Sequence, residues 1–151
     1  MKRYICIIFI GLWLTMAWGG PTSPSPKLGP NTDFFLKVRE LWLKKDHKEL
    51  LPYLDQRVRI KLGRTSRAYP EMYAGAQVAG ILKKHFSEIY IVKFEYIAEK
   101  MEETRGVASY GYQTLDNGVQ NSTLLYIHLQ LKIGPNQEKS WVISMIHEVE
   151  L

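Results

Sequence analysis

The spacing of apolar residues divides the chain into a helical first half and a β-rich second half. Apolar residues recur at helical spacing from Thr32, a good N-cap residue, until Lys44 interrupts them. Residues 47–55 predict a second, short helix, in which a proline limits the helical part. Residues 74–89 predict a third helix with one apolar face. We therefore expect three helices before the main strands.

A period of two residues marks the strands. A short strand is expected over residues 57–62, followed by a polar loop over residues 63–73. Four more strands are then predicted, over residues 90–101, 107–115, 123–133 and 140–149. Asn117-Gly118 is a hairpin signal between two of them, because this pair readily takes positive φ. Helices followed by consecutive antiparallel strands predict an α+β fold, with N-terminal helices packed on a curved, mainly antiparallel sheet.

The strand over residues 123–133 has the clearest alternation. One face carries Leu125, Ile127, Leu129 and Leu131, and the other carries Leu124, Tyr126, His128, Gln130 and Lys132. We expect the first face to join the core, so that Tyr126, His128 and Gln130 point outward. Such a row is a candidate contact for a ligand or a partner, and its alternatives are catalysis by His128 or a plain surface.

The first nineteen residues have the three-part layout of a secretory signal peptide. Lys2 and Arg3 precede an apolar run over residues 4–18, and small residues follow with cleavage expected between Gly19 and Gly20. Residues 20–31 contain four prolines and predict a flexible linker, and residues 32–151 predict a single domain. We expect an exported protein, periplasmic or extracellular. A retained signal that anchors the domain to a membrane is the alternative.

Composition narrows the range of partners. The only cysteine, Cys6, lies in the apolar run, so the domain is expected to have neither a disulfide nor a cysteine-ligated metal. The formal net charge is +5. Five basic residues cluster within eleven positions: Arg57, Arg59, Lys61, Arg64 and Arg67. This cluster is either a solvated strand face or a surface for weak contact with an anionic partner such as phospholipid, acidic glycan or protein. Export and the lack of an RNA-binding motif argue against nucleic acid.

Motifs for chemistry are scarce. The four histidines lack metal-ligand spacing, and neither a nucleophile elbow nor a phosphate-binding glycine loop is present, so we expect no metal and no cofactor. His85 shares a helix face with Leu82 and Phe86, which predicts a packed histidine with one hydrogen bond. Aromatic residues are plentiful, and Tyr110 and Trp141 join Tyr126 as candidates for contact with an apolar or ring-shaped small molecule.

The chain resembles an exported bacterial family known as domain of unknown function 4783, within the nuclear transport factor 2-like (cystatin-like) superfamily. The resemblance lies in residues 50–62, 77–86, 92–94, 110–114, 126–132 and 141–143. Two positions differ from the family pattern: Lys45 stands where a glycine often ends the first helix, and Thr123-Leu124 stand where an arginine often precedes the Tyr126 position. The resemblance implies a cone-shaped cavity between sheet and helices, and often a homodimer through the outer face of the sheet. It implies no known reaction.

Two functional hypotheses follow. The first is a non-enzymatic exported binding or interaction domain that uses the cone or the sheet face, with an apolar small molecule or an envelope protein as partner. The alternative comes from the resemblance, since some members of the superfamily are isomerases or dehydratases. Such an enzyme requires a histidine or carboxylate base inside the cone. A titratable side chain in the cavity therefore separates the two hypotheses.

Overall fold

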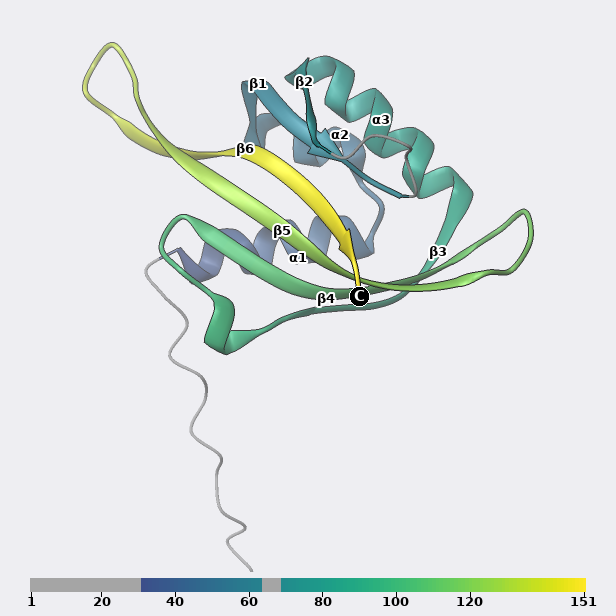
Figure 1. Cartoon of the computed structure of the whole chain (residues 1–151). Helices are drawn as coiled ribbons and strands as arrows, with labels where there is room; N and C mark the ends of the chain where they lie inside the picture. The colour runs from purple at the N-terminus through teal and green to yellow at the C-terminus, as the bar shows by residue number, and fades with distance from the viewer. Residues whose placement is uncertain (1–30, 64–68) are drawn as a thin grey trace, which may run out of the picture.

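The computed structural model describes residues 31–63 and 69–151, in which helices pack on one curved sheet (Figure 1). The helices are α1 (Thr32–Leu43), α2 (His47–Leu50) and α3 (Gly75–Glu88), with 3-10 turns η1 (Leu51–Tyr53) and η2 (Ala98–Lys100). The strands are β1 (Leu54–Lys61), β2 (Glu71–Ala74), β3 (Ile89–Tyr96), β4 (Arg105–Thr114), β5 (Gln120–Ile133) and β6 (Lys139–Glu150). The predicted α+β class is confirmed.

The strands form one six-stranded sheet in the order β2-β1-β6-β5-β4-β3. Strands β3 to β6 are antiparallel to their neighbours in chain order, as predicted. The turn between β4 and β5 needs Gly118, whose φ of 69° lies in the left-handed region that glycine adopts without strain. Strand β1 pairs in parallel with β6, so the first long strand and the last lie side by side.

The prediction of a loop over residues 63–73 is wrong at its end, because residues 71–74 form the edge strand β2. This strand pairs antiparallel with β1, with Arg59 opposite Met72. It has four residues, and none of them is fully buried. So short a strand shows too few alternations for a period of two to be recognised, and its partner strand decides its structure.

One face of β5 enters the core as predicted, except at its end. Leu125 and Ile127 are fully buried and Leu129 is nearly so, whereas Leu131 is 38% exposed. Leu131 pairs with Trp141 in the β5–β6 hairpin, which projects past the helices at the upper left of Figure 1. The prediction of a buried Leu131 is wrong because the alternation of a strand continues beyond the point where helices cover it.

Aromatic side chains fill much of the space between helices and sheet. Trp42 of α1 is fully buried, and its ring centroid lies 5.2 Å from that of Phe86, 5.9 Å from Phe94 and 6.0 Å from Tyr110. Most of these rings meet edge to face, a geometry that contributes about 0.5–1.5 kcal/mol per pair beyond burial. The concave side of the sheet is therefore packed near α1.

Helix α1 ends in a left-handed residue that is not glycine. The backbone N–H of Asp46 donates to the carbonyl of Leu41 at 2.9 Å, and Lys45 has a φ of 57°. This is a Schellman ending, in which glycine is usual because it has no Cβ. The Lys45 ammonium donates to the carbonyl of Ile89, which ties the helix end to β3. The start also differs from prediction, since the cap residue is Asn31 rather than Thr32.

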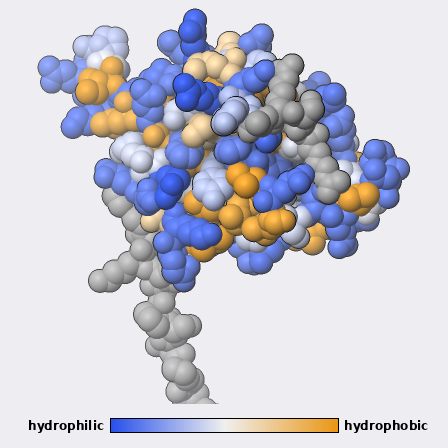
Figure 2. All heavy atoms as spheres, in the orientation of Figure 1, coloured by the Kyte–Doolittle hydropathy of each residue, from blue (hydrophilic) through white to orange (hydrophobic). Residues whose placement is uncertain are grey.

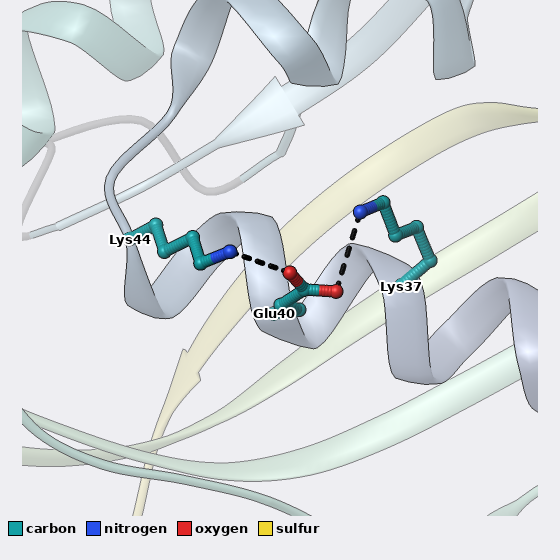
Figure 3. A network of polar contacts seen from close by, with 3 residues as sticks. All are labelled: Lys37, Glu40 and Lys44. Carbon is teal, nitrogen blue, oxygen red and sulfur yellow. Dashed lines mark hydrogen bonds and ion pairs between the residues drawn. The ribbon is translucent and has the colours of Figure 1, made fainter.

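The solvent side of α1 carries a small ion-pair network (Figure 3). Glu40 accepts hydrogen bonds from Lys44 at 2.6 Å and from Lys37 at 3.2 Å. The hydrogen bond from Lys44, and after it the bond from Lys37, holds the pKa of Glu40 below its ordinary value. The bond to Glu40 in turn raises the pKa of Lys44. All three side chains are well exposed, so solvent screens the network and it adds little to stability.

The visible side of the domain in Figure 2 is mostly hydrophilic, with orange hydrophobic residues gathered in several places among the blue ones. Within residues 31–63 and 69–151, no helix has both the length and the apolar character needed to cross a bilayer.

Candidate functional site

A pocket of about 480 Å³ opens between the C-terminal half of α3, the end of β1 and the β4–β5 hairpin. Its apolar walls are Leu62, Ile81, Ile89 and Val119. Its polar walls are Lys84, His85, Glu88, Tyr112, Thr114, Asn117 and Asn121, with Gly63 at the end of β1. The volume lies in the range of small-molecule sites, and the mixture of apolar walls with a few polar groups is typical of them.

His85 is the central titratable group of the pocket wall. Helical spacing places it on the same side of α3 as the buried Leu82 and Phe86, which orients its ring toward the sheet. Its Nε2 atom lies 3.0 Å from the hydroxyl of Tyr110. Burial, and secondarily the charge of Lys45, lowers the pKa of His85 to about 4. The imidazole is therefore neutral at physiological pH.

A buried carboxylate lies behind the pocket wall. Glu148 of β6 is 5% exposed, and it follows Ile146 by two residues, so the strand directs it to the core side. Its Oε1 accepts from the hydroxyl of Tyr112 at 2.9 Å, and its Oε2 accepts from the backbone N–H of Gly63 at 2.6 Å. Both oxygens are thus held by groups that line the pocket. The carboxylate joins β6, β4 and the end of β1.

The polar groups at the rim are largely satisfied by each other. Thr114 donates to the side-chain oxygen of Asn117 at 2.5 Å, and Asn121 donates to the carbonyl of Val119 at 3.2 Å. Lys84 and Glu88 form an exposed pair one helical turn apart, with the ammonium 3.9 Å from the carboxylate. The charges of Lys84 and Glu88 therefore offset each other at the rim. Within the described residues, Nδ1 of His85 has no hydrogen bond.

Two aromatic candidates from the sequence lie away from any open surface of this pocket. Tyr110 is 1% exposed, belongs to the core and supports His85 from behind. Its burial raises its pKa above the ordinary value. Trp141 is half-buried against the core in the β5–β6 hairpin, opposite Leu131. A contact between either ring and a ligand stays a prediction.

The row Tyr126, His128 and Gln130 lies on the outer face of β5, as the alternation predicts. Tyr126 lies across from His147 of β6, with ring centroids 6.2 Å apart. Burial is the main cause that lowers the pKa of both His128 and His147, with smaller effects from Arg105 on His128 and from Lys61 on His147. His128 is on the opposite side of the sheet from the pocket, so the sheet separates it from His85.

The basic cluster is described in part. Arg57 and Arg59 are exposed and Lys61 is half-buried on β1, whereas Arg64 and Arg67 lie outside the described residues. So do the signal segment at residues 1–19, with its cleavage site at Gly19 and Gly20, and nearly all of the linker at residues 20–31. Across residues 31–63 and 69–151, no group of three histidine, cysteine or acidic side chains is arranged to hold a metal ion.

Glu148 is not among the candidate residues that the sequence predicts. The available signal was the position of a carboxylate in phase with Ile146 on the core face of a strand, where a charge is buried only if it is paired. Its partner Gly63 is 85 residues away, and no local pattern points to that contact. For the β4–β5 hairpin the sequence predicts only a turn. It does not predict that the hairpin lies close to α3.

Comparison with known proteins finds likeness in structure rather than in sequence. No family model and no curated protein matches the chain. A nuclear transport factor 2-like protein of Burkholderia xenovorans is similar with a TM-score of 0.54 at 12% identity, over 82% of this chain and 91% of that one. A DUF4783 family protein of Bacteroides uniformis gives 0.51 at 14% identity, over 76% and 94%. A nuclear transport factor 2-like protein of unknown function from Cytophaga hutchinsonii gives 0.50 at 11%, over 79% and 88%.

At these identities the likeness establishes the fold alone. The structural neighbours include the family that the sequence resembles, and the helices lie on one face of a curved sheet as that resemblance implied. The chain has the nuclear transport factor 2-like fold.

Proposed function

We propose that this protein is a small-molecule binding domain whose ligand occupies the pocket beside α3. The observation that carries the proposal is the neutral imidazole of His85 in a wall of mixed apolar and polar residues, with Nε2 bonded to Tyr110 and Nδ1 without a hydrogen bond within the described residues. The ligand expected is neutral, ring-shaped and largely apolar, with one hydrogen-bonding group that meets Nδ1. Its binding needs no charge, because the rim charges of Lys84 and Glu88 offset each other.

The same features argue against the isomerase or dehydratase alternative. A general base works best with a pKa near the working pH, and a histidine with a pKa of about 4 is a weak base. Glu148 is no better placed, because both of its oxygens already accept hydrogen bonds from Tyr112 and Gly63. The pocket region does contain titratable groups, but His85 is bonded to Tyr110 and Glu148 to Tyr112 and Gly63. Binding is therefore the function that this geometry favours over proton transfer.

The first test is to fill the pocket. Ile81 lines it, so I81W places an indole in the space where the ligand would sit. K83W adds the same side chain on the exposed side of the same helix, outside the pocket, and is the matched control. Indole and p-cresol serve as neutral ring probes, benzoate as the charged comparison, and amide chemical shifts of the full chain report binding.

We expect indole or p-cresol to shift amides of Gly63 and Asn121 in the parent and in K83W, and to shift none in I81W. Benzoate should bind less well than either neutral probe, because Lys84, the cation among the described residues of the pocket wall, is paired with Glu88. If neither neutral probe shifts the pocket amides, or if I81W and K83W respond alike, the proposed function is wrong. A bell-shaped pH dependence of turnover on any enolisable ketone would instead favour the enzyme.

Export is part of this proposal. Its support is the sequence of residues 1–19, where two positive charges precede the apolar run. The mass of the protein recovered from a producing cell tests it: cleavage before Gly20 is expected, and a full-length mass in the cytoplasmic fraction contradicts it. The partner envelope protein and the homodimer stay predictions.

A further inference from the structure

The outer face of the sheet carries a second hollow, about 350 Å³ in volume, on the side opposite to the pocket. It lies where β1, β6 and β5 run side by side, and we call it the outer groove. The polar residues that line it are Arg57, Arg59, Thr104, His128, Gln130 and Ser144. Arg57 and Arg59 of the basic cluster thus meet His128 and Gln130 of the Tyr-His-Gln row in one place.

The strands beside the groove pair irregularly. The register between β1 and β6 shifts between Leu54 and Arg59, and the register between β5 and β6 shifts between His128 and Leu129. At the second shift Ser144 is the extra residue of β6, and its hydroxyl donates to the carbonyl of His128 at 3.3 Å. Bulges bend a strand and redirect its side chains, and they are frequent beside functional sites. Here two of them adjoin the same hollow.

The charge in the groove is positive and uncompensated. Arg57 and Arg59 are two residues apart on one face of β1, which separates their Cα atoms by about 7 Å. Neither guanidinium has an ion pair or hydrogen bond within the described residues, and no residue that lines the groove is acidic. Two carboxylates on neighbouring segments are paired with other cations, Asp55 with Lys132 and Glu102 with Arg105.

His128 adds a hydrogen-bonding group to this cationic setting. Arg105 of β4 and His147 of β6 both face it and contribute to the lowering of its pKa, while Glu102 acts weakly in the opposite direction. The ring is therefore neutral at physiological pH and offers a hydrogen bond rather than a further charge. Gln130 and Thr104 supply neutral polar atoms on the same side.

We propose that the outer groove is a binding site for a phosphate monoester group. A tetrahedral dianion accepts hydrogen bonds from two guanidinium groups at once, and arginine is suited to this because its donors form a planar fork. The hydroxyl and amide groups of the groove complete the set of donors. The volume admits a ligand of the size of a phosphorylated three-carbon alcohol. This site is independent of the pocket beside α3 and differs from it in the charge of its ligand.

The test compares two double variants of the full chain with equal charge change. R57Q/R59Q removes the two groove cations, and K48Q/K83Q removes two exposed lysines elsewhere. Glycerol 3-phosphate is the soluble probe, and amide shifts of Gln130 and Ser144 locate it. We expect binding about tenfold weaker in R57Q/R59Q, since each arginine supplies a charge-assisted hydrogen bond, and no such loss in K48Q/K83Q.

A second arm separates a soluble ligand from a lipid headgroup. Phosphatidylcholine vesicles with and without phosphatidic acid are mixed with the same three proteins. Binding to pure phosphatidylcholine measures the contribution of the apolar run at residues 4–18, and only the increase caused by phosphatidic acid counts. An increase that R57Q/R59Q abolishes and K48Q/K83Q retains identifies a lipid headgroup as the source of the phosphate.

The proposal is overturned by either of two results. The first is that neither glycerol 3-phosphate nor phosphatidic acid is bound. The second is that both double variants weaken binding equally, because this would reflect net charge alone. If the parent protein forms a dimer that buries Arg57 and Arg59 in this face and binds no phosphate, the proposal is also overturned. Indole binding at the pocket is measured in a separate experiment, and none of these outcomes changes its interpretation.

Discussion

The pocket beside α3 and the outer groove lie on opposite faces of one sheet, and their polar groups differ in burial and in hydrogen bonding. In the pocket beside α3, His85 and the nearby Glu148 are buried and bonded to tyrosine hydroxyls. In the outer groove, Arg57 and Arg59 are exposed and have no partner within the described residues. A buried polar group costs free energy unless it is hydrogen-bonded, whereas an exposed charge is solvated by water. The first face therefore suits a neutral ligand and the second an anion.

The largest expected effect tests whether stability resides on the concave side. Trp42 is fully buried amid three aromatic rings, so W42A should lower the free energy of unfolding by about 3–5 kcal/mol through lost burial and a cavity. The change in the urea midpoint at constant slope measures it. A loss below about 1 kcal/mol would mean that the helices are not packed on the sheet as described.

The pH dependence of stability sharpens the same contrast. His85 has a folded-state pKa of about 4 against an ordinary value of 6.5. Between these two pH values the unfolded chain therefore binds a proton at His85 that the folded chain does not bind. Stability should therefore be complete above pH 6.5 and fall as the pH drops from 6.5 to about 4, by up to about 3 kcal/mol. H85Q should flatten this decline. Equal slopes in parent and variant would show that His85 is not buried as a neutral group.

Removal of the buried carboxylate comes next in size. E148A leaves the Tyr112 hydroxyl and the Gly63 N–H without their acceptor, which should cost about 2–3 kcal/mol of unfolding free energy. Y112F removes one of the two donors and should cost about 1 kcal/mol. In the E148A/Y112F double variant the two losses should be less than additive. Strict additivity in denaturant unfolding would show that the two side chains do not interact.

The smallest effect on stability is expected on the outer face. R57Q/R59Q replaces two exposed side chains that have no partner among residues 31–63 and 69–151, so the free energy of unfolding should change by less than about 0.5 kcal/mol. Thermal unfolding of the purified variant checks this. A gain in stability would indicate that the two like charges repel each other in the free protein. A large loss would show that the arginines support the sheet, contrary to their exposure.

Local sequence patterns were sufficient where structure depends on neighbours along the chain. The alternation through Leu125, Ile127 and Leu129 predicted which face of β5 enters the core. Asn117-Gly118 predicted the β4–β5 turn, and the spacing of His85 with Leu82 and Phe86 predicted a packed histidine with one hydrogen bond. Each of these rests on strand, turn or helix geometry within a few residues.

Contacts between distant parts of the chain were decided by the tertiary structure. The parallel pairing of β1 with β6 brings Arg57 and Arg59 beside His128, and it brings Gly63 to Glu148. Nothing in the sequence near Arg57 specifies which strand lies beside it. Strand order depends on how the whole apolar surface is buried at once, so it is a property of the assembled core. The sequence by itself determined the elements and their faces, and the fold decided which of their side chains share a site.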